Sequence, residues 1–263
     1  MRCWILYEKS DLEQNRFFAE NLKEYGDELG LECEIVTSED IDAYEPADVV
    51  ISRIRDPDLS SSLEDNGATV FNRSSVNRIC NDKAYTYAFV KSLGIPFLPF
   101  STPGSDLPKG PPWVVKSRDG HGGSEVFKAE NKQDVDRFVS RIGSDRAIIQ
   151  QFCTDPGKDM RVYVLGGRII TSVLRSSEVD FRANFKLGGK AELVEPSEDV
   201  QKMVRKISSE LMADFIGVDF IFNDGEPYLN EIEDAVGTRM IYSLTDLDPA
   251  KMYMQYIARC LNL

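Results

Sequence analysis

The segment of residues 113–128 constrains the fold of this chain more than any other. An apolar strand pattern at 113–116 ends on Lys116, a glycine-rich turn follows at 118–124, and a second strand pattern covers 125–128. No helix pattern follows the glycines, so the segment is neither a Walker A loop nor a dinucleotide-binding fingerprint. Its three glycines let several backbone N–H groups turn toward one point, which forms a nest for anions, and the lysine adds a point charge for phosphate. We interpret the segment as a hairpin flap over a phosphate site; an ordinary hairpin turn with a solvated lysine is the alternative.

Strand and helix patterns alternate over roughly the first 75 residues. Four apolar strand patterns lie at residues 3–7, 32–36, 49–54 and 70–71. Between the first two, apolar residues recur at helical spacing from Phe18 to Leu29. Strands that alternate with helices are typical of a parallel sheet, so we predict a small N-terminal α/β lobe over residues 1–75.

The rest of the chain predicts two further lobes. For a central lobe, residues 76–153, we predict a helix capped by Asp82, a proline-rich loop, the flap and a helix capped by Asn131. For a C-terminal lobe, residues 154–263, the patterns predict hairpins at 160–175 and 218–232 and helices at 197–212 and 249–261. The predicted fold class is therefore mixed α/β with three lobes.

Composition excludes several classes of function. The formal net charge of −13 repels phosphate backbones, so we expect no nucleic-acid partner. No segment approaches the ~20 apolar residues that cross a bilayer, and the apolar start is too short for a signal peptide, so we expect a cytoplasmic protein with no membrane partner. Five scattered cysteines and a single histidine, His121, argue against a zinc site. For His121, in a glycine-rich loop, we favour a solvated side chain over a catalytic one.

Three carboxylates interrupt the apolar patterns of the last hairpin. Asp219 lies within the apolar run 218–222, and Glu231 and Glu233 alternate with an isoleucine, so both glutamates point to one face of their strand. A carboxylate inside an apolar strand is costly unless it is paired with a charge or bound to a metal, and hard oxygen ligands suit Mg²⁺. A solvated polar face is the alternative.

The register of that hairpin decides whether the carboxylates can share a metal. A two-residue loop at Asp224 and Gly225 would pair Asp219 with Asn230 and leave Glu231 on the opposite face. A shared site therefore requires a three-residue loop or a bulge.

Taken in order, these pieces resemble the ATP-grasp superfamily, and most closely its branch of ligases that add glutamate to a ribosomal-protein tail and of lysine-biosynthesis carrier-protein ligases. The matching stretches cover roughly residues 76–240 in the order and spacing of that branch. They are Asn81-Asp82-Lys83, Val114-Val115-Lys116 with its glycine loop, Gln150-Gln151-Phe152, the run from Asp159 to Arg168, Arg175, the run from Asp180 to Asn184 with Gly188-Gly189, Gly217-Val218-Asp219, and the run from Asn230 to Glu233.

The resemblance implies a three-lobed ATP-grasp fold and a role for each group. The residues that would hold the ATP phosphates or close over them are Lys83, Lys116, Gly120, Gly122, Gly123 and Ser124. Those that would meet the adenine and the ribose are Gln151, Phe152 and Asp159. Those that would meet the phosphates and an acyl phosphate are Arg175, Arg182 and Asn184. Those that would hold Mg²⁺ are Asp219, Glu231 and Glu233.

The implied reaction joins two substrates at the expense of ATP. A carboxylate attacks the γ-phosphate to form an acyl phosphate, and an amine then displaces phosphate to form an amide. No covalent nucleophile is needed, which agrees with a chain that lacks a Ser–His or Cys–His signature. We therefore predict an ATP- and Mg²⁺-dependent carboxylate–amine ligase for small-molecule or peptide substrates, and a homo-oligomer is left open. The chain departs from the family pattern at Ser117, Gln151 and Glu233, where proline, glutamate and asparagine are frequent.

Two rival hypotheses remain. An ATP-dependent kinase on the same fold would phosphorylate an alcohol and would form ADP without an amine. A non-catalytic nucleotide-binding protein would show no turnover at all.

Overall fold

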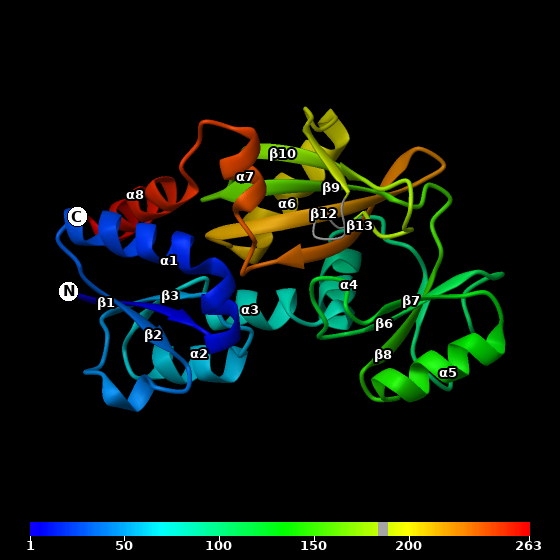
Figure 1. The fold of residues 1–263 in the computed structure, drawn as a ribbon, viewed down its shortest axis with the longest axis horizontal. Coiled ribbons are helices and arrows are strands. Elements are labelled where there is room, and N and C mark those ends of the chain that lie inside the picture. The colour runs from blue at the N-terminus through cyan, green and yellow to red at the C-terminus, as the bar shows by residue number, and fades with distance from the viewer. Residues whose placement is uncertain (184–188) are drawn as a thin grey trace.

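The computed structural model describes residues 1–183 and 189–263, and its strands form three sheets (Figure 1). The first sheet has the order β2-β1-β3-β4 and is parallel throughout, as predicted for the N-terminal region. Its strands are β1 (Arg2–Tyr7), β2 (Glu32–Thr37), β3 (Val49–Ser52) and β4 (Thr69–Phe71). Its helices are α1 (Lys9–Glu28), the 3-10 turn η1 (Ile41–Ala43), α2 (Pro57–Asp65) and α3 (Ser74–Cys80).

The second sheet carries the flap. It has the order β5-β8-β6-β7 and is antiparallel. Its region comprises α4 (Lys83–Ser92), β5 (Phe100–Ser101), β6 (Trp113–Ser117), β7 (Val126–Ala129), α5 (Lys132–Ile142) and β8 (Ala147–Gln151). Lys116 pairs with Val126 across β6 and β7, so the glycine-rich turn joins two antiparallel strands as predicted. The side chains of Asp82 and Asn131 cap α4 and α5, which confirms both predicted helix starts.

The third sheet is antiparallel, with the order β11-β10-β9-β12-β13. Its region comprises β9 (Lys158–Leu165), β10 (Arg168–Ser176), β11 (Lys190–Leu193), α6 (Glu198–Leu211), β12 (Phe215–Asn223), β13 (Glu226–Glu233), α7 (Arg239–Leu244) and α8 (Pro249–Leu261). Side chains alternate across a strand, so the central strand β9 serves two cores. Val162 and Val164 pack in the cluster that contains α6, whereas Tyr163 and Leu165 pack in the cluster that contains α8.

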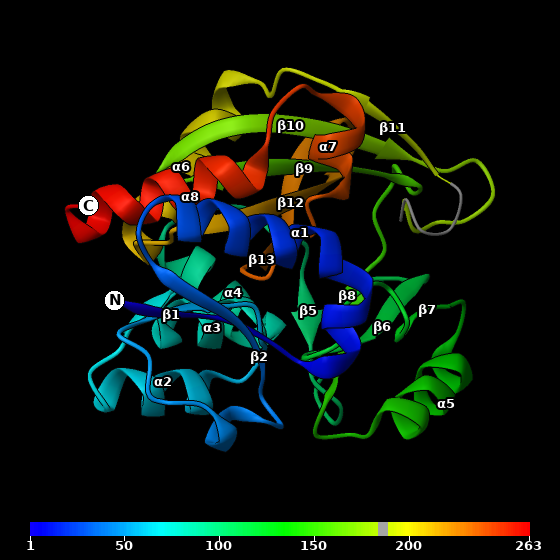
Figure 2. The same ribbon diagram turned by 60° about the vertical axis from the view of Figure 1, so that its left-hand side comes forward.

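One hydrophobic core joins the first and third sheets. It contains Ile5 and Leu22 from the N-terminal region together with Tyr163, Phe215 and Met254. Helices α1 and α8 lie side by side in both ribbon views (Figures 1 and 2). The last helix, which the sequence assigned to the C-terminal lobe, therefore also completes the N-terminal core. The lobe boundaries at 75/76 and 153/154 stay a prediction.

The sequence analysis did not predict several short helices and strands. Helices α2, α3 and α7 and strand β11 have four to nine residues each, too short for an apolar period to identify. The start of α2 nevertheless carries a readable signal, because Asp56 caps it and Pro57 occupies its first turn. Within residues 1–183 and 189–263, no helix combines the length and the apolar character that crossing a membrane requires.

Candidate active site

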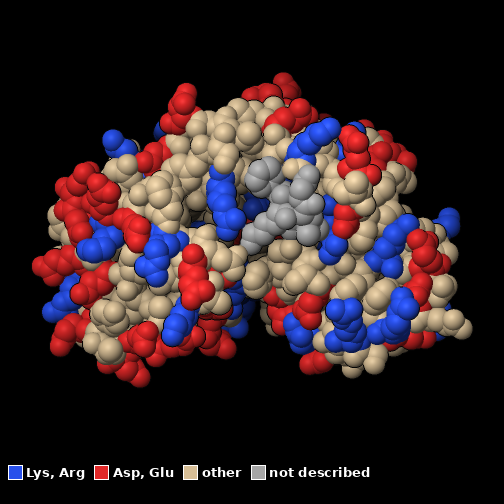
Figure 3. All heavy atoms as spheres, in the orientation of Figure 1, with Lys and Arg blue, Asp and Glu red and all other residues tan. Residues whose placement is uncertain are grey.

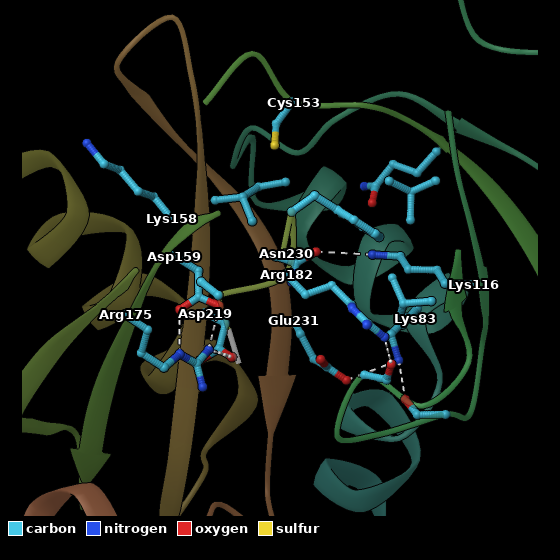
Figure 4. Close-up of a pocket in the computed structure, with 18 of the residues that line it drawn as sticks. Lys83, Lys116, Cys153, Lys158, Asp159, Arg175, Arg182, Asp219, Asn230 and Glu231 are labelled. Carbon is cyan, nitrogen blue, oxygen red and sulfur yellow. Dashed lines mark hydrogen bonds and ion pairs between the residues drawn. The ribbon is translucent and has the colours of Figure 1, made fainter. Parts of the chain in front are cut away.

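A cleft lies between the second and third sheets, and side chains from both converge on it (Figure 4). Its walls come from the flap, the ends of β6 and β8, and strands β9, β10, β12 and β13. The predicted site residues that line it are Lys83, Lys116, Gly120, Gly122, Gly123, Gln151, Phe152, Asp159, Arg175, Arg182, Asp219, Glu231 and Glu233. In the space-filling view, Lys and Arg side chains lie beside the hollow between the two lower parts of the molecule (Figure 3). In the cleft itself, the six lysines and arginines among the lining residues outnumber the four carboxylates, so a basic site is built locally on an acidic protein.

Two of the lysines that line the cleft differ in the charge of their partners. Lys83 begins α4; its Nζ donates to the Gly120 carbonyl at 2.5 Å and forms an ion pair with Glu231 at 3.0 Å. The Nζ of Lys116 donates to the Tyr87 hydroxyl at 3.0 Å and to Oδ1 of Asn230 at 3.1 Å. Burial lowers the pKa of Lys116 to about 8. Lys83 is therefore neutralised by an acid, whereas the described partners of Lys116 are both uncharged.

Asp219 lies at the centre of a buried charge cluster. Its Oδ1 accepts a hydrogen bond from Nε of Arg161 at 2.8 Å, and its Oδ2 accepts from Nη2 of Arg161 and of Arg175 at 2.7 and 2.8 Å. Arg161 also pairs with Glu233 at 2.7 Å, and Nη2 of Arg175 donates to Asp159 at 2.9 Å. Burial alone would raise the pKa of Asp219, but the two guanidinium groups outweigh it and hold that pKa below its usual range.

The outer carboxylates of this cluster behave differently. Burial raises the pKa of Asp159 to about 6, because Arg175 compensates only part of the desolvation. Burial likewise raises the pKa of Glu233 in spite of Arg161. As the pH falls, Asp159 is therefore protonated well before Asp219.

A β-bulge sets the register that the carboxylates need. Asn223 pairs with Glu226 across a two-residue turn, Phe220 pairs with Leu229, and Asp219 pairs with Glu231. Asn230 is the extra residue of β13, and its side chain reaches Lys116. Asp219, Glu231 and Glu233 thus share a face through the bulge, one of the two solutions that the sequence left open.

Cations of the protein itself neutralise the three carboxylates. Arg161 and Arg175 pair with Asp219, Arg161 also pairs with Glu233, and Lys83 pairs with Glu231. In this arrangement, no group of three or more His, Cys, Asp or Glu side chains among residues 1–183 and 189–263 is placed to hold a metal ion.

Cations also hold the flap against the cleft. Nη1 of Arg182 donates to the Gly123 carbonyl at 2.8 Å, and Lys83 donates to the Gly120 carbonyl. Ser124 was predicted to meet phosphate, but it is exposed, donates to the His121 carbonyl at 3.3 Å and does not line the cleft. His121 lines the cleft, and desolvation lowers its pKa, so the ring is neutral at pH 7.

A family comparison agrees with this arrangement. The RimK-like ATP-grasp domain matches residues 107–257, which is more than half of the chain. The chain belongs to the RimK-like ATP-grasp family. This confirms the resemblance inferred from the ordered motifs and the predicted ATP-grasp fold, and with it the expectation of an ATP-binding site.

Relatives of this RimK-like chain are found among bacterial and human proteins. Uncharacterized protein MG011 of Mycoplasma genitalium is 28% identical, over 97% of this chain and 92% of its own. Human N-acetylaspartylglutamate synthase A is 30% identical over 80% of this chain, which spans 59% of that relative. The crystal structure of a RimK domain ATP-grasp protein from Sphaerobacter thermophilus aligns with a TM-score of 0.75 at 17% identity, over 98% of this chain and 99% of its own. The similarity to this crystal structure shows that the two chains share a fold.

The RimK-like cleft also contains residues that the sequence reasoning did not assign. Arg161 falls within the matching run from Asp159 to Arg168 but received no role, yet it bridges Asp219 and Glu233. Tyr87 and Asn230 accept hydrogen bonds from the amine of Lys116, and Gln150 donates to the Tyr87 hydroxyl. For Tyr87 the available signal was its position one helical turn after Lys83, on the same face of α4. Asn184, predicted to meet the phosphates, lies outside the described residues.

Proposed function

We propose that this chain is an ATP- and Mg²⁺-dependent carboxylate–amine ligase that forms an amide through an acyl phosphate. One observation carries the proposal: a single cleft gathers a glycine flap, three lysines, three arginines and four carboxylates. Phosphoryl transfer to a carboxylate needs this combination, because its transition state spreads negative charge over the phosphoryl oxygens. The name of the human relative, a synthase of N-acetylaspartylglutamate, supports the same reaction class.

The nucleotide is proposed to enter under the flap. Lys83 and Lys116 contact its phosphates, and the glycine turn closes over them. Gln151 and Phe152, at the end of β8, flank the adenine, and Asp159 lies toward the ribose. Because Asp159 accepts from Arg175, it also fixes the guanidinium that faces the phosphates.

The carboxylates fit Mg²⁺ by their chemistry. Glu231 and Glu233 lie two residues apart on one strand face, with side chains 20% and 26% exposed, so their oxygens are accessible from the cleft. Oδ1 of Asp219 accepts a single hydrogen bond and keeps one lone pair for a ligand. Carboxylate oxygens are the ligands that Mg²⁺ prefers, and the ion would neutralise charge on the phosphates.

The reaction follows from these placements. An oxygen of the substrate carboxylate attacks the γ-phosphorus, and the bond to the bridging oxygen of ADP breaks. The amine nitrogen then attacks the acyl carbon and loses a proton, and phosphate leaves with the former carboxylate oxygen. Arg175 and Arg182 stabilise the negative charge of both steps, and the closed flap excludes water that would hydrolyse the acyl phosphate.

A four-way turnover experiment tests the proposal. ADP and inorganic phosphate are measured with ATP and Mg²⁺ alone, with a panel of N-acetylated amino acids and short peptides as acids, with a panel of amino-acid amides as amines, and with both panels together. A ligase releases one ADP and one phosphate per amide, and only when acid and amine are present. A phosphorylated alcohol without free phosphate would instead establish the kinase. If the protein binds ATP but shows no turnover with any pair of acid and amine, the hypothesis of a non-catalytic nucleotide-binding protein would be favoured.

We also propose a cytoplasmic location. The five cysteines are free thiols, and Cys3, Cys33 and Cys80 are buried, as expected in a reducing compartment. The net charge of −13 favours small or peptide substrates over nucleic acid.

A further inference from the structure

We propose that Tyr87 is a positioning residue that aims the ammonium of Lys116 at the nucleotide phosphates through its hydroxyl group. The inference rests on the proposed nucleotide site, and it extends the binding machinery to a residue inside the core. Tyr87 lies on α4, one turn after Lys83, and its side chain is fully buried.

The Tyr87 hydroxyl uses its whole hydrogen-bonding capacity. It donates to the backbone carbonyl of Asn230 at 3.0 Å and accepts from Lys116 at 3.0 Å and from Nε2 of Gln150 at 3.1 Å. A phenol has one donor and two acceptor sites, so its orientation is fixed from three directions. The three partners come from β13, β6 and β8, which belong to both walls of the cleft.

The aromatic ring is held as firmly as the hydroxyl. It stacks on Phe97 at 5.0 Å between centroids, with an interplanar angle of 8°, and packs against Phe100 at 4.9 Å. The hydroxyl is therefore a fixed point, because neither ring rotation nor solvent exchange can move it.

The two hydrogen bonds of Lys116 leave its positive charge uncompensated. An ammonium has three protons, of which one goes to Tyr87 and one to Oδ1 of Asn230. In the part of the chain that the structure describes, the third proton has no acceptor, so it remains for a ligand in the cleft that Lys116 lines. Both partners are neutral, so they orient the cation without cancelling its charge, in contrast to Lys83 with Glu231.

A double-mutant cycle tests the positioning role by the affinity for Mg·ATP, which needs no ligase turnover. Tyr87→Phe keeps the ring and removes one oxygen. We expect the Kd to rise about tenfold, because a loss of this size corresponds to one hydrogen bond to a charged group. Lys116→Met should weaken binding at least as much. If Tyr87 acts through Lys116, adding Tyr87→Phe to Lys116→Met should cost less than twofold more, because the shared interaction is already lost.

Tyr256→Phe is the matched control. Its hydroxyl donates to Asp214 at 2.7 Å, away from the cleft, so nucleotide affinity should not change. Gln150→Leu is the second variant should Tyr87→Phe not fold, and it should weaken binding in the same direction by a smaller factor.

Three results would overturn the inference: unchanged affinity in Tyr87→Phe, additive losses in the double variant, or unchanged affinity in Lys116→Met. Where turnover is measured, KM for ATP should rise with little change in kcat, since phosphate contacts made in both ground and transition states affect binding uniformly. A protein that binds ATP and follows the cycle but makes no amide would refute the ligase and leave the positioning role intact.

Discussion

Asp219 connects stability with chemistry at the scale of single residues. Its side chain is 4% exposed and neutralises Arg161 and Arg175, which are themselves buried. Loss of this carboxylate should affect folding as well as turnover, because it leaves two buried guanidinium groups with less compensation.

Asp219→Asn should therefore destabilise the fold by about 3 kcal/mol, within the range for a broken buried ion pair. Glu231→Gln should cost about 1 kcal/mol, since the amide oxygen still accepts from Lys83, which also donates to Gly120. Urea unfolding of both variants measures the difference. Equal stability of the two would contradict the role of Asp219 as the centre of the cluster.

Lys116 should make nucleotide binding depend on pH. The groups that act on it are Glu231 and Cys153, which favour its charged form, but burial prevails and lowers its pKa to about 8. Only the ammonium attracts phosphate, so affinity for Mg·ATP should be full below pH 8 and should fall above it by up to about tenfold per pH unit. Titrations with a fluorescent ATP analogue measure this. In Lys116→Met the affinity should be weaker and should no longer depend on pH in this range; a pH dependence that persists would assign the titration to another group.

At the scale of elements, the flap is a hairpin whose turn needs unusual backbone angles. Gly122 has φ +66° and Gly123 has φ +76°, a region that costs other residues roughly 1–2 kcal/mol. Its polar contacts to Lys83 and Arg182 can be exchanged for contacts to phosphate. Closure is therefore expected to be coupled to the nucleotide.

Gly122→Ala should weaken ATP binding by about tenfold, because the methyl group raises the free energy of the closed turn, with its positive φ, by about 1–2 kcal/mol. Gly104→Ala is its control: Gly104 has φ +89° and, like Gly122, no atom near the added methyl group, but it lies outside the cleft lining. Both variants should lose similar stability, and only Gly122→Ala should change the affinity measured by calorimetry. Equal affinities would exclude the turn from nucleotide binding.

At the scale of the whole molecule, the first and third sheets share a large core, whereas one face of the second sheet packs in a separate cluster. The separate cluster contains Trp113, Val115, Val135 and Ile149 and is small. Regions with a small core open more easily than regions that share a large one.

Native-state hydrogen exchange should therefore separate two units. Amides of β6, β7 and β8 should exchange through a lower-energy opening than amides of β1 and β12, which should exchange together. A single common opening energy for all five strands would contradict this division.

The sequence could predict the parallel first sheet, the flap hairpin, both capped helices and the ATP-grasp family, because each depends on local pattern or on motif order. It could not decide how Asp219 comes to face Glu231. The turn at Asp224 and Gly225 is the even loop that their identities favour, and the bulge at Asn230 depends on contacts with Lys116 in another sheet. Nor could it find the Arg161–Asp219 pair, since that requires the order of strands β9 and β12.

The transfer of carboxylate oxygen to phosphate tests the central claim most directly. The substrate acid is labelled with ¹⁸O in its carboxyl group and incubated with the protein, ATP, Mg²⁺ and the amine, and the released phosphate is analysed by mass spectrometry. An acyl phosphate predicts one ¹⁸O in the phosphate for each amide formed, and no amide or labelled phosphate with Glu231→Gln. Amide formed with unlabelled phosphate would contradict the account.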